Sequence, residues 1–392
     1  MRFALYSNLL SPHTAPLAQE LISHYGDGVY VCQKRGGEPF RTSQMAEQFG
    51  DKLLYEEDSP ARVASILENA DVVLTGVRDF ELMERRVAAK KVTLYQSERW
   101  FKPENLFALG RSEYGGFGIW VDGFWKNLFP FAIKRAKRIM RLFESNSFLY
   151  LPIGVHAARD MVRMCGAFGG DYSCVFRSPK LEFERCPGGS VWCREESHMH
   201  NNAITKCLER SRMWGYFVAS SAVQPPRHHS RVNKVLWVGR MLRLKCVDTI
   251  IKAVGNMPSI QLLIVGNGPD EPRIRNIATR YTNVSFLDMI RNEEVRKLMR
   301  EYDTYIFSSN SFDGWGAVVN EALEEGMRVY GTYEAGSSAT MLPDSNLFHA
   351  QDWKRLRKIL TESNAYADIG VWSVKKAAKK LVEIIDEVLY GV

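Results

Sequence analysis

The 392-residue sequence lacks the features that mark several protein classes. It has no uncharged apolar run near the roughly 18 residues that a membrane-spanning helix requires. Its first residues, MRFALYSNLL, contain no apolar segment long enough for a signal peptide. The seven cysteines form no C-x-x-C pair, which argues against a disulfide scaffold. We therefore expect a reduced, cytoplasmic protein.

A metal site is not expected either. The only suggestive set of cysteines and histidines has the spacing C-x6-C-x4-H-x-H, which matches no common zinc site. Its members are Cys186, Cys193, His198 and His200.

The charge balance is mildly positive, with 52 Lys and Arg against 45 Asp and Glu. This balance permits an anionic partner without requiring one. Neither half of the chain is strongly basic, and no aromatic motif of the kind that stacks single-stranded bases is present, so we expect no nucleic-acid partner.

Residues 123–143 are the largest cluster without an acidic residue, and they contain six basic residues interleaved with Phe and Trp. Two interpretations remain open. The segment is either a helix with an apolar core face and a solvated basic face, or a surface that contacts anionic lipid or a lipid diphosphate. The second would place the protein at the inner face of the cytoplasmic membrane.

The first part of the chain alternates short apolar runs with helical periodicity, which predicts βαβ units and a parallel sheet. Residues 165–213 do not follow this pattern and hold five of the seven cysteines, so we predict an irregular insertion there. The strand candidates are 2–7, 28–33, 71–76, 92–97 and 148–154, and the helix candidates are 15–26, 61–70 and 80–91.

Pro225 and Pro226 interrupt regular structure, and we place a domain boundary there. Beyond it the alternation is clearer and predicts a second doubly wound domain. Its strand candidates are 235–239, 260–266, 284–289, 304–309 and 328–332, and its helix candidates are 247–257, 271–281, 292–302 and 317–326. We assign the domains to 1–225, 226–370 and a terminal helix in 371–392.

Ligands of open α/β sheets bind outside the carboxyl ends of the strands. At the end of the 235–239 strand, Gly239 is followed by Arg240 and Lys245. An arginine fork and a lysine point charge suit a diphosphate. The next strand runs into Asn267 and Gly268, where glycine permits a close approach of the backbone.

The most informative stretch follows the strand 304–309. Asp313, Gly314, Trp315 and Gly316 form a loop that leads directly into a helix. The N–H groups of Ala317 and Val318 at the helix start favour a phosphate. Glu321 lies about one turn further along, where its carboxylate can accept hydrogen bonds from sugar or ribose hydroxyls.

Taken together, these motifs resemble the retaining glycosyltransferases of the GT-B fold, in the large family-four group. The resemblance covers residues 232–345, and Asp313 and Glu321 stand at the two acids of the family's E-x7-E signature. The motifs, in the family's order, are VLWVGRMLRLKCVDTIIKAV, LLIVGNGP, SSNSFDGWG and DGWGAVVNEALEEG. The resemblance implies an α/β fold of two Rossmann-like domains facing across a cleft, with the C-terminal helix crossing back to the first domain.

The resemblance also implies the site and its substrates. A nucleotide-diphosphate sugar is the donor substrate, and no cofactor or metal is needed. Arg240 and Lys245 would contact the diphosphate and Glu321 the ribose. Asp313 and the backbone of Gly314, Trp315 and Gly316 would contact the donor sugar. The base would lie near Asp288, Met289 and Ile290.

The chain departs from the family at several positions. Asp313 is one methylene shorter than the usual glutamate, and Cys246 stands where the family has glycine. The glycine pair after the first strand is replaced by Asn8, Leu9 and Leu10, and the family's histidine in this domain is not obvious. Acceptor-side candidates are Ser97, Glu98 and His156.

We therefore expect a retaining, metal-independent transfer of a sugar to a saccharide or lipid-linked acceptor, as in surface polysaccharide assembly. The leaving diphosphate itself would take the acceptor proton. Two alternatives stay open. One is another GT-B enzyme acting on a nucleotide sugar, such as an epimerase, and the other is a non-catalytic nucleotide-sugar binding protein.

Overall fold

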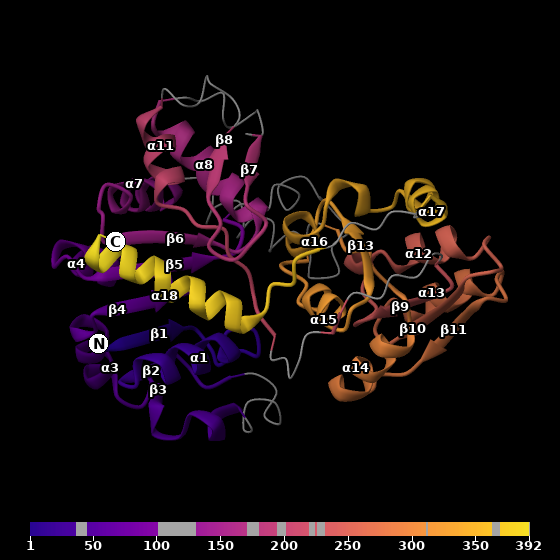
Figure 1. Cartoon of the computed structure of the whole chain (residues 1–392), viewed down its shortest axis with the longest axis horizontal. Helices are drawn as coiled ribbons and strands as arrows, with labels where there is room; N and C mark the ends of the chain where they lie inside the picture. Colours follow the sequence, from indigo (N-terminus) through magenta and orange to yellow (C-terminus); the bar gives the residue numbers. More distant parts are fainter. Residues whose placement is uncertain are drawn as a thin grey trace. The chain divides into compact units, whose positions relative to one another are not determined.

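The structure is a computed structural model, and it describes residues 1–36, 45–100, 131–170, 180–193, 201–218, 224–225, 232–310, 313–362 and 369–391. These residues form two compact units (Figure 1). The first unit contains the described residues up to 218 together with those of 372–391. The second contains the described residues from 224 to 371.

The first unit is built on a six-stranded parallel sheet with strand order β3-β2-β1-β4-β5-β6. Its strands are β1 (Phe3–Ser7), β2 (Gly28–Cys32), β3 (Leu53–Tyr55), β4 (Val72–Thr75), β5 (Val92–Ser97) and β6 (Phe148–Pro152), and a separate antiparallel pair is β7 (Leu181–Phe183) with β8 (Val191–Cys193). Its helices are α1 (Ala15–Tyr25), η1 (Gly50–Lys52), α3 (Pro60–Asn69), α4 (Phe80–Ala88), α7 (Phe131–Leu142), α8 (Val155–Phe168), α11 (Asn202–Glu209) and α18 (Val374–Tyr390).

The second unit repeats this plan with strand order β11-β10-β9-β12-β13-β14. Its strands are β9 (Lys234–Val238), β10 (Gln261–Val265), β11 (Val284–Leu287), β12 (Thr304–Phe307), β13 (Arg328–Thr332) and β14 (Leu347–Phe348). Its helices are η2 (Arg243–Lys245), α12 (Val247–Val254), α13 (Glu271–Ala278), α14 (Asn292–Glu301), α15 (Val318–Glu324), α16 (Gly336–Met341), η3 (Asp344–Asn346) and α17 (Trp353–Thr361).

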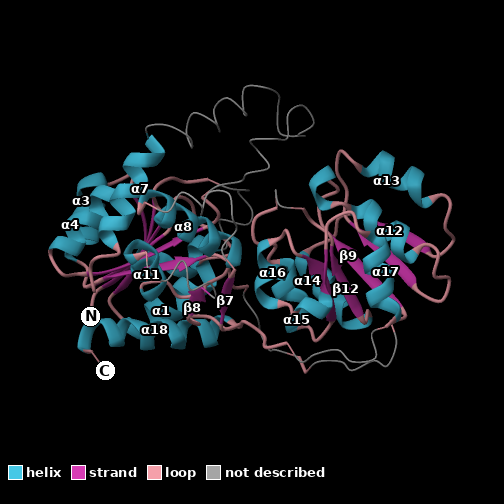
Figure 2. Ribbon diagram, turned by 90° about the horizontal axis from the view of Figure 1, so that it is seen from above, coloured by secondary structure: helices cyan, strands magenta, loops and turns pink. Residues whose placement is uncertain are grey.

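Both sheets therefore have the doubly wound order 3-2-1-4-5-6. In this order the first and fourth strands are neighbours, and the connections run in opposite directions from that point. In the second unit α12 packs with α13 and α17, whereas α15 packs with α14 and α16, so two groups of helices cover the sheet (Figure 2). The switch point of the second unit lies between β9 and β12.

Local sequence signals explain where several helices begin. Asp79 begins α4 by accepting a hydrogen bond from the N–H of Leu82, and Asp352 does the same for Arg355 in α17. Ser373 caps α18, which ends at Gly391 in the left-handed conformation. These caps determine where the helices begin and end, but they do not determine which elements the helices pack against.

The C-terminal helix α18 belongs to the first unit, where it packs against α1 (Figure 1). Its buried face is Val374, Ala377, Ala378, Leu381, Ile384 and Ile385. Just before it, the Trp372 indole N–H donates to the carbonyl oxygen of Arg185 at 3.2 Å. The helix is thus part of the first unit's core.

The predicted elements agree with the structure to within a few residues, with specific exceptions. The edge strands β3 and β14 and the helices α16 and α17 were not predicted. The stretch 165–213 is more regular than the predicted irregular insertion, because its described residues complete α8 and form β7, β8 and α11. The α8 helix was not predicted either; ten of its residues are buried, and the half-buried His156, Arg159 and Arg163 lie on one face.

Candidate functional site

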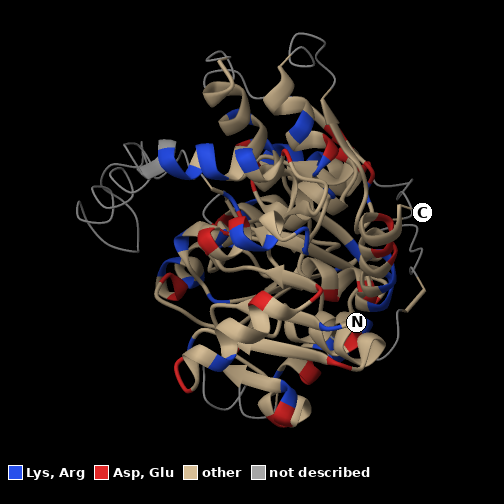
Figure 3. Ribbon diagram, turned by 90° about the vertical axis from the view of Figure 1, so that its left-hand side faces the viewer, with Lys and Arg blue, Asp and Glu red and all other residues tan. Residues whose placement is uncertain are grey.

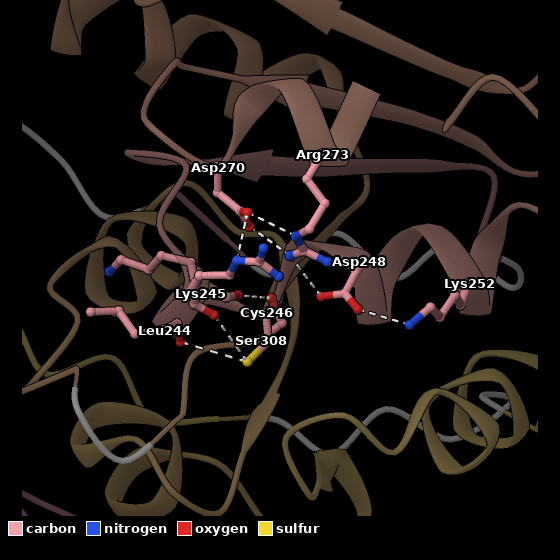
Figure 4. Close-up of polar contacts among 9 residues, drawn as sticks. Leu244, Lys245, Cys246, Asp248, Lys252, Asp270, Arg273 and Ser308 are labelled. Atoms are coloured by element: carbon pink, nitrogen blue, oxygen red, sulfur yellow. Dashed lines mark hydrogen bonds and ion pairs between the residues drawn. The ribbon is translucent and has the colours of Figure 1, made fainter. Parts of the chain in front are cut away.

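The loops that follow β9 and β12 lie side by side at the carboxyl edge of the second unit's sheet. The Ser308 hydroxyl donates to the carbonyl oxygen of Lys245 at 2.6 Å (Figure 4), and the Asn310 N–H donates to that of Leu244 at 2.8 Å. These bonds join two motifs that are more than sixty residues apart. The switch point is thus the place where the predicted donor residues meet.

Lys245 and Asp313 form an ion pair between these loops. Their side chains are largely shielded from water, with 20% and 16% of their surface exposed, respectively. The Lys245 ammonium also lies 5.6 Å from the centre of the Phe307 ring. A partly buried cation and carboxylate therefore face each other at the edge where a ligand would bind.

Cys246 ends η2 with left-handed backbone angles, φ 47° and ψ 42°. Only glycine adopts this region without a steric penalty, which gives a physical reason for the glycine found here in the resembling family. The thiol is buried, and burial raises its pKa to about 12. It faces the carbonyl oxygens of Arg243 and Leu244 at 3.6 and 3.7 Å, so we assign it a structural role (Figure 4).

A charged network holds the loop after β9 in place (Figure 4). The buried carboxylate of Asp270 pairs with Arg243 at 3.0 Å and with Arg273 at 2.5 Å. Arg273 also reaches Asp248 at 3.4 Å. The hydrogen bond with Asp270 raises the pKa of Arg273, so it remains charged. The sequence analysis did not identify this network, because its members come from three separate segments.

The glycines after β10 serve loop packing. A Cβ atom on Gly266, where φ is 126°, would lie 2.1 Å from the carbonyl oxygen of Gly239. One on Gly268 would lie 2.5 Å from that of Met241, whose N–H donates to the Asn267 carbonyl at 2.7 Å. The close backbone approach predicted for a ligand is here an approach between two loops. Arg240 and the Asn267 side chain are exposed beside them.

The loop from Asp313 to Gly316 is fixed by the segment after β13. The N–H groups of Gly336 and Ser337 donate to the carbonyl oxygens of Gly314 and Trp315 at 3.1 and 2.9 Å. A Cβ atom on Gly316, where φ is 82°, would lie 2.2 Å from the Phe307 ring. Its conformation and position therefore both require glycine.

The Trp315 ring is buried, and its indole N–H donates to the Asn320 side chain at 2.8 Å. The ring thus packs beneath the loop and supports it. Ala317 directly precedes α15, which begins at Val318. The helix predicted from the sequence began one residue earlier, at 317. Both residues are half-buried.

Glu321 lies on α15, and its Oε1 accepts a hydrogen bond from the Asn292 amide at 3.1 Å. Burial raises the pKa of the Tyr305 phenol, and the charges of Glu321 and Asp313 raise it further. Tyr305 donates to the carbonyl oxygen of Val238 at the end of β9. The charges of Asp313 and Glu321 thus both raise the pKa of Tyr305, which lies beside the switch point.

The residues predicted to contact the base follow β11. Asp288 and Met289 are exposed, and Ile290 is half-buried. The Gly266 N–H donates to the Leu287 carbonyl oxygen at 2.9 Å, so this loop adjoins the one after β10.

Comparison with known proteins identifies this part of the chain. Residues 222–362 match the model of the family "Glycosyl transferases group 1". This part of the chain, from β9 to α17, is therefore similar to a group 1 glycosyltransferase domain.

Two curated proteins resemble this glycosyltransferase domain. The GtfA subunit of UDP-N-acetylglucosamine–peptide N-acetylglucosaminyltransferase from Limosilactobacillus reuteri is 23% identical over 141 residues, which is 34% of this chain and 27% of that protein. The uncharacterized glycosyltransferase MJ1069 from Methanocaldococcus jannaschii is 28% identical over 120 residues, which is 29% of this chain and 31% of that protein. The matches thus span less than a third of either relative's length.

Solved structures match over almost the whole chain. Anabaena Alr3699/HepE in complex with UDP has a TM-score of 0.56 at 13% identity, over 99% of this chain and 98% of that one. A glycosyltransferase from Rickettsia africae has a TM-score of 0.50 at 12% identity, over 100% and 99%. At these identities the likeness establishes the fold alone, which is the GT-B fold with two Rossmann-like units.

The acceptor-side candidates lie in the first unit of the chain. Ser97 is buried, and its hydroxyl contacts the Tyr150 hydroxyl at 2.9 Å and the Trp100 indole N–H at 2.8 Å. These contacts give Ser97 a structural role. Glu98 and His156 are half-buried at the carboxyl ends of β5 and β6.

Two residues that the sequence analysis missed gather near Glu98. Burial raises the pKa of Tyr216, and the charge of Glu98 and a hydrogen bond with it raise that pKa further. The His13 ring stacks on the Tyr216 ring, with 5.4 Å between the ring centres. Segments after β1, β5 and α11 therefore meet in the first unit.

The cysteine and histidine set considered for zinc is only partly described. Cys186 is exposed and Cys193 is buried in β8, whereas His198 and His200 lie outside the described residues. Among the described residues, no helix is both long and apolar enough to cross a bilayer.

Proposed function

We propose that this chain is a retaining glycosyltransferase that moves a sugar from a nucleotide-diphosphate sugar to a saccharide or lipid-linked acceptor, in surface polysaccharide or glycoconjugate assembly. The observation that carries the proposal is the facing pair of Lys245 and Asp313 at the β9–β12 switch point of a group 1 glycosyltransferase domain. A cation and a carboxylate there can bind a diphosphate and a sugar hydroxyl, respectively.

In the proposed complex, Arg240 and Lys245 contact the diphosphate. Lys245 would exchange part of its contact with Asp313 for a phosphate oxygen, which places the donor sugar beside the Asp313 carboxylate. The rigid loop Gly314–Gly316 presents backbone groups to the same sugar. Glu321 binds the ribose hydroxyls, and Asp288–Ile290 lie beside the base.

The central task of the reaction is to stabilise the negative charge that develops on the leaving nucleoside diphosphate. Preorganised cations in a partly buried site perform this task well. The Ser308 hydroxyl holds the backbone of Lys245 in place, and Asp313 holds its ammonium at the site before the donor binds. The leaving phosphate takes the acceptor proton, and the proposed step uses no metal.

The acceptor is proposed to bind the first unit at the cluster of Glu98, His156, His13 and Tyr216. Carboxylate and imidazole groups are suitable partners for sugar hydroxyls. The Tyr216 hydrogen bond orients Glu98, and the stacked His13 limits the space around it.

The donor assignment is tested by thermal shift with UDP-, GDP- and ADP-sugars. A ligand that binds only the folded protein raises its melting temperature by mass action. We expect one nucleotide class to stabilise the wild type, and Glu321→Ala to reduce that shift strongly. The control is Glu271→Ala, the same exchange on α13. This variant should show the full ligand-induced shift in melting temperature. An equal shift in wild type and Glu321→Ala would contradict the assignment of Glu321.

We further propose that α7 contacts an anionic membrane surface. Its apolar face is core, since Ala136, Ile139 and Leu142 are buried. Lys134, Lys137 and Arg141 are exposed at helical spacing, so they lie on one outer face (Figure 3). Arg138 pairs with Glu84 at 2.6 Å, and the exposed Arg141 reaches the same carboxylate at 3.9 Å. The helix would therefore bind the membrane surface through its charges and would not insert apolar side chains into the bilayer.

Replacing Lys134, Lys137 and Arg141 with alanine should weaken binding to phosphatidylglycerol vesicles on the order of 100-fold, because each cation contributes about 1 kcal/mol near an anionic surface. Cosedimentation measures this, with phosphatidylcholine vesicles as the neutral reference. The matched control removes three exposed lysines of α18, Lys375, Lys376 and Lys379. Loss of binding in the control instead of the α7 variant would refute this surface.

A further inference from the structure

One face of α14 presents a row of polar side chains to the carboxylates of α15. Asn292, Arg296 and Arg300 are spaced four residues apart, so they lie on the same side of the helix. They contact Glu321, Glu324 and Glu325 in turn. Asn292 lies 3.1 Å from Glu321. Arg296 lies 3.0 Å from Glu324 and 2.5 Å from Glu325. Arg300 lies 2.7 Å from Glu325.

The arginine end of this row is buried and charged. Glu324 and Glu325 have at most 1% of their side-chain surface exposed, and Arg296 has 12%. Burial acts to raise the pKa of Glu325, but the hydrogen bonds and charges of Arg300 and Arg296 hold it below its usual value. These bonds fix α14 on α15 in a defined register.

At the other end of the row the partner changes from a guanidinium to a neutral amide. A guanidinium would neutralise the carboxylate and can engage both of its oxygens. One amide N–H occupies one of about four lone-pair positions of a carboxylate and adds no charge. Asn292 therefore orients Glu321 without placing a positive charge beside it, which suits a carboxylate that accepts hydrogen bonds from a ligand.

The position of Asn292 adds a second argument. It is the first residue of α14 and directly follows the Asp288–Arg291 loop that is proposed to lie beside the base. A change in that loop would therefore move the amide that holds Glu321. The contact links the base side of the nucleotide site to its ribose side.

We infer that Asn292 is a positioning residue that aims Glu321 at the vicinal hydroxyls of the donor ribose. This inference rests on the proposed function, because it presupposes a nucleotide at this site. It predicts that Asn292 governs discrimination between a ribonucleotide and its deoxy counterpart, and that its effect passes through Glu321.

The test measures the dissociation constants of a nucleoside diphosphate and its 2′-deoxy form by calorimetry. The probe is UDP, GDP or ADP, whichever gives the largest thermal shift with the wild type. Asn292→Ala should reduce the preference for the ribose form about three- to tenfold, the effect of one misplaced hydrogen bond. Asn292→Asp, which is isosteric and removes the donor, should reduce it at least as much.

Two comparisons separate positioning from general destabilisation. Arg300→Ala removes a contact from the same helix face and should lower the melting temperature without changing the ribose preference. In a Glu321→Ala background, Asn292→Ala should have no further effect on that preference. An unchanged preference in both Asn292 variants, with Glu321→Ala still weakening binding, would overturn this inference alone. If Glu321→Ala has no effect, or no diphosphate binds, the proposed donor site fails as well.

Discussion

Replacing Lys245 with alanine is expected to lower the rate constant of sugar transfer by about two to three orders of magnitude. A preorganised donor of positive charge in a shielded site has an effect of this size when it stabilises charge that develops in the transition state. Lys245 meets both conditions, because its side chain is only 20% exposed and its carbonyl oxygen is held by Ser308. Steady-state transfer assays with the donor found by thermal shift measure the change.

The control for this prediction is Lys252→Ala on the neighbouring helix α12. Lys252 pairs with Asp248 at 2.8 Å, and 43% of its side chain is exposed. The control removes the same charge from the same unit and should transfer sugar at nearly the wild-type rate. Rates within a few-fold of each other in the two variants would exclude Lys245 from the reaction.

Arg296→Met is expected to destabilise the second unit by about 3–5 kcal/mol, because it leaves the buried carboxylates of Glu324 and Glu325 without their shared cation. Urea unfolding followed by tryptophan fluorescence measures the change in the free energy of unfolding. Arg275→Met is the control. Arg275 pairs with Glu271 on an exposed helix surface, where an ion pair contributes about 0–1 kcal/mol.

The same network has a defined dependence on pH. The folded-state pKa of Glu325 lies below its ordinary value of 4.5. Its contribution to stability is therefore complete above that value and is lost as the pH falls through the folded-state pKa. The difference in stability between wild type and Arg296→Met should narrow as the pH falls through the lowered pKa of Glu325. A difference that stays constant down to acid unfolding would mean that the ion pairs do not contribute.

Much of the fold could be predicted because it is encoded in local periodicity. Strands buried on both faces appear as short apolar runs, and helices at the sheet surface have an apolar stripe. Two of the elements that escaped prediction, β3 and β14, are edge strands of three and two residues, which are too short to show such a run.

The candidate site was predictable where it depends on strand ends. The carboxyl ends of parallel strands meet at one edge, so the loops containing Lys245 and Asp313 were expected to be close. Pairs between distant segments carry no such signal. Nothing in the sequence links Asn292 to Glu321 or His13 to Tyr216, because these contacts depend on how helices and loops pack.

Some residues were identified for a reason that the structure changes. Gly266 and Gly268 permit the contact of two loops, and the Trp315 ring supports its own loop from inside. Cys246 shows the opposite case, in which a side chain occupies left-handed backbone that favours glycine. The sequence patterns singled out these positions but did not indicate what each residue contacts.

The place of α18 has a consequence for the order in which the chain can fold during synthesis. The first unit contains both the earliest strands and this last helix, with the whole second unit between them. Until the ribosome has released residues 374–390, the surface of α1 that α18 covers stays exposed to water. The second unit is continuous in sequence and can complete its core earlier. During synthesis, the first unit is therefore begun before the second unit but completes its core after it.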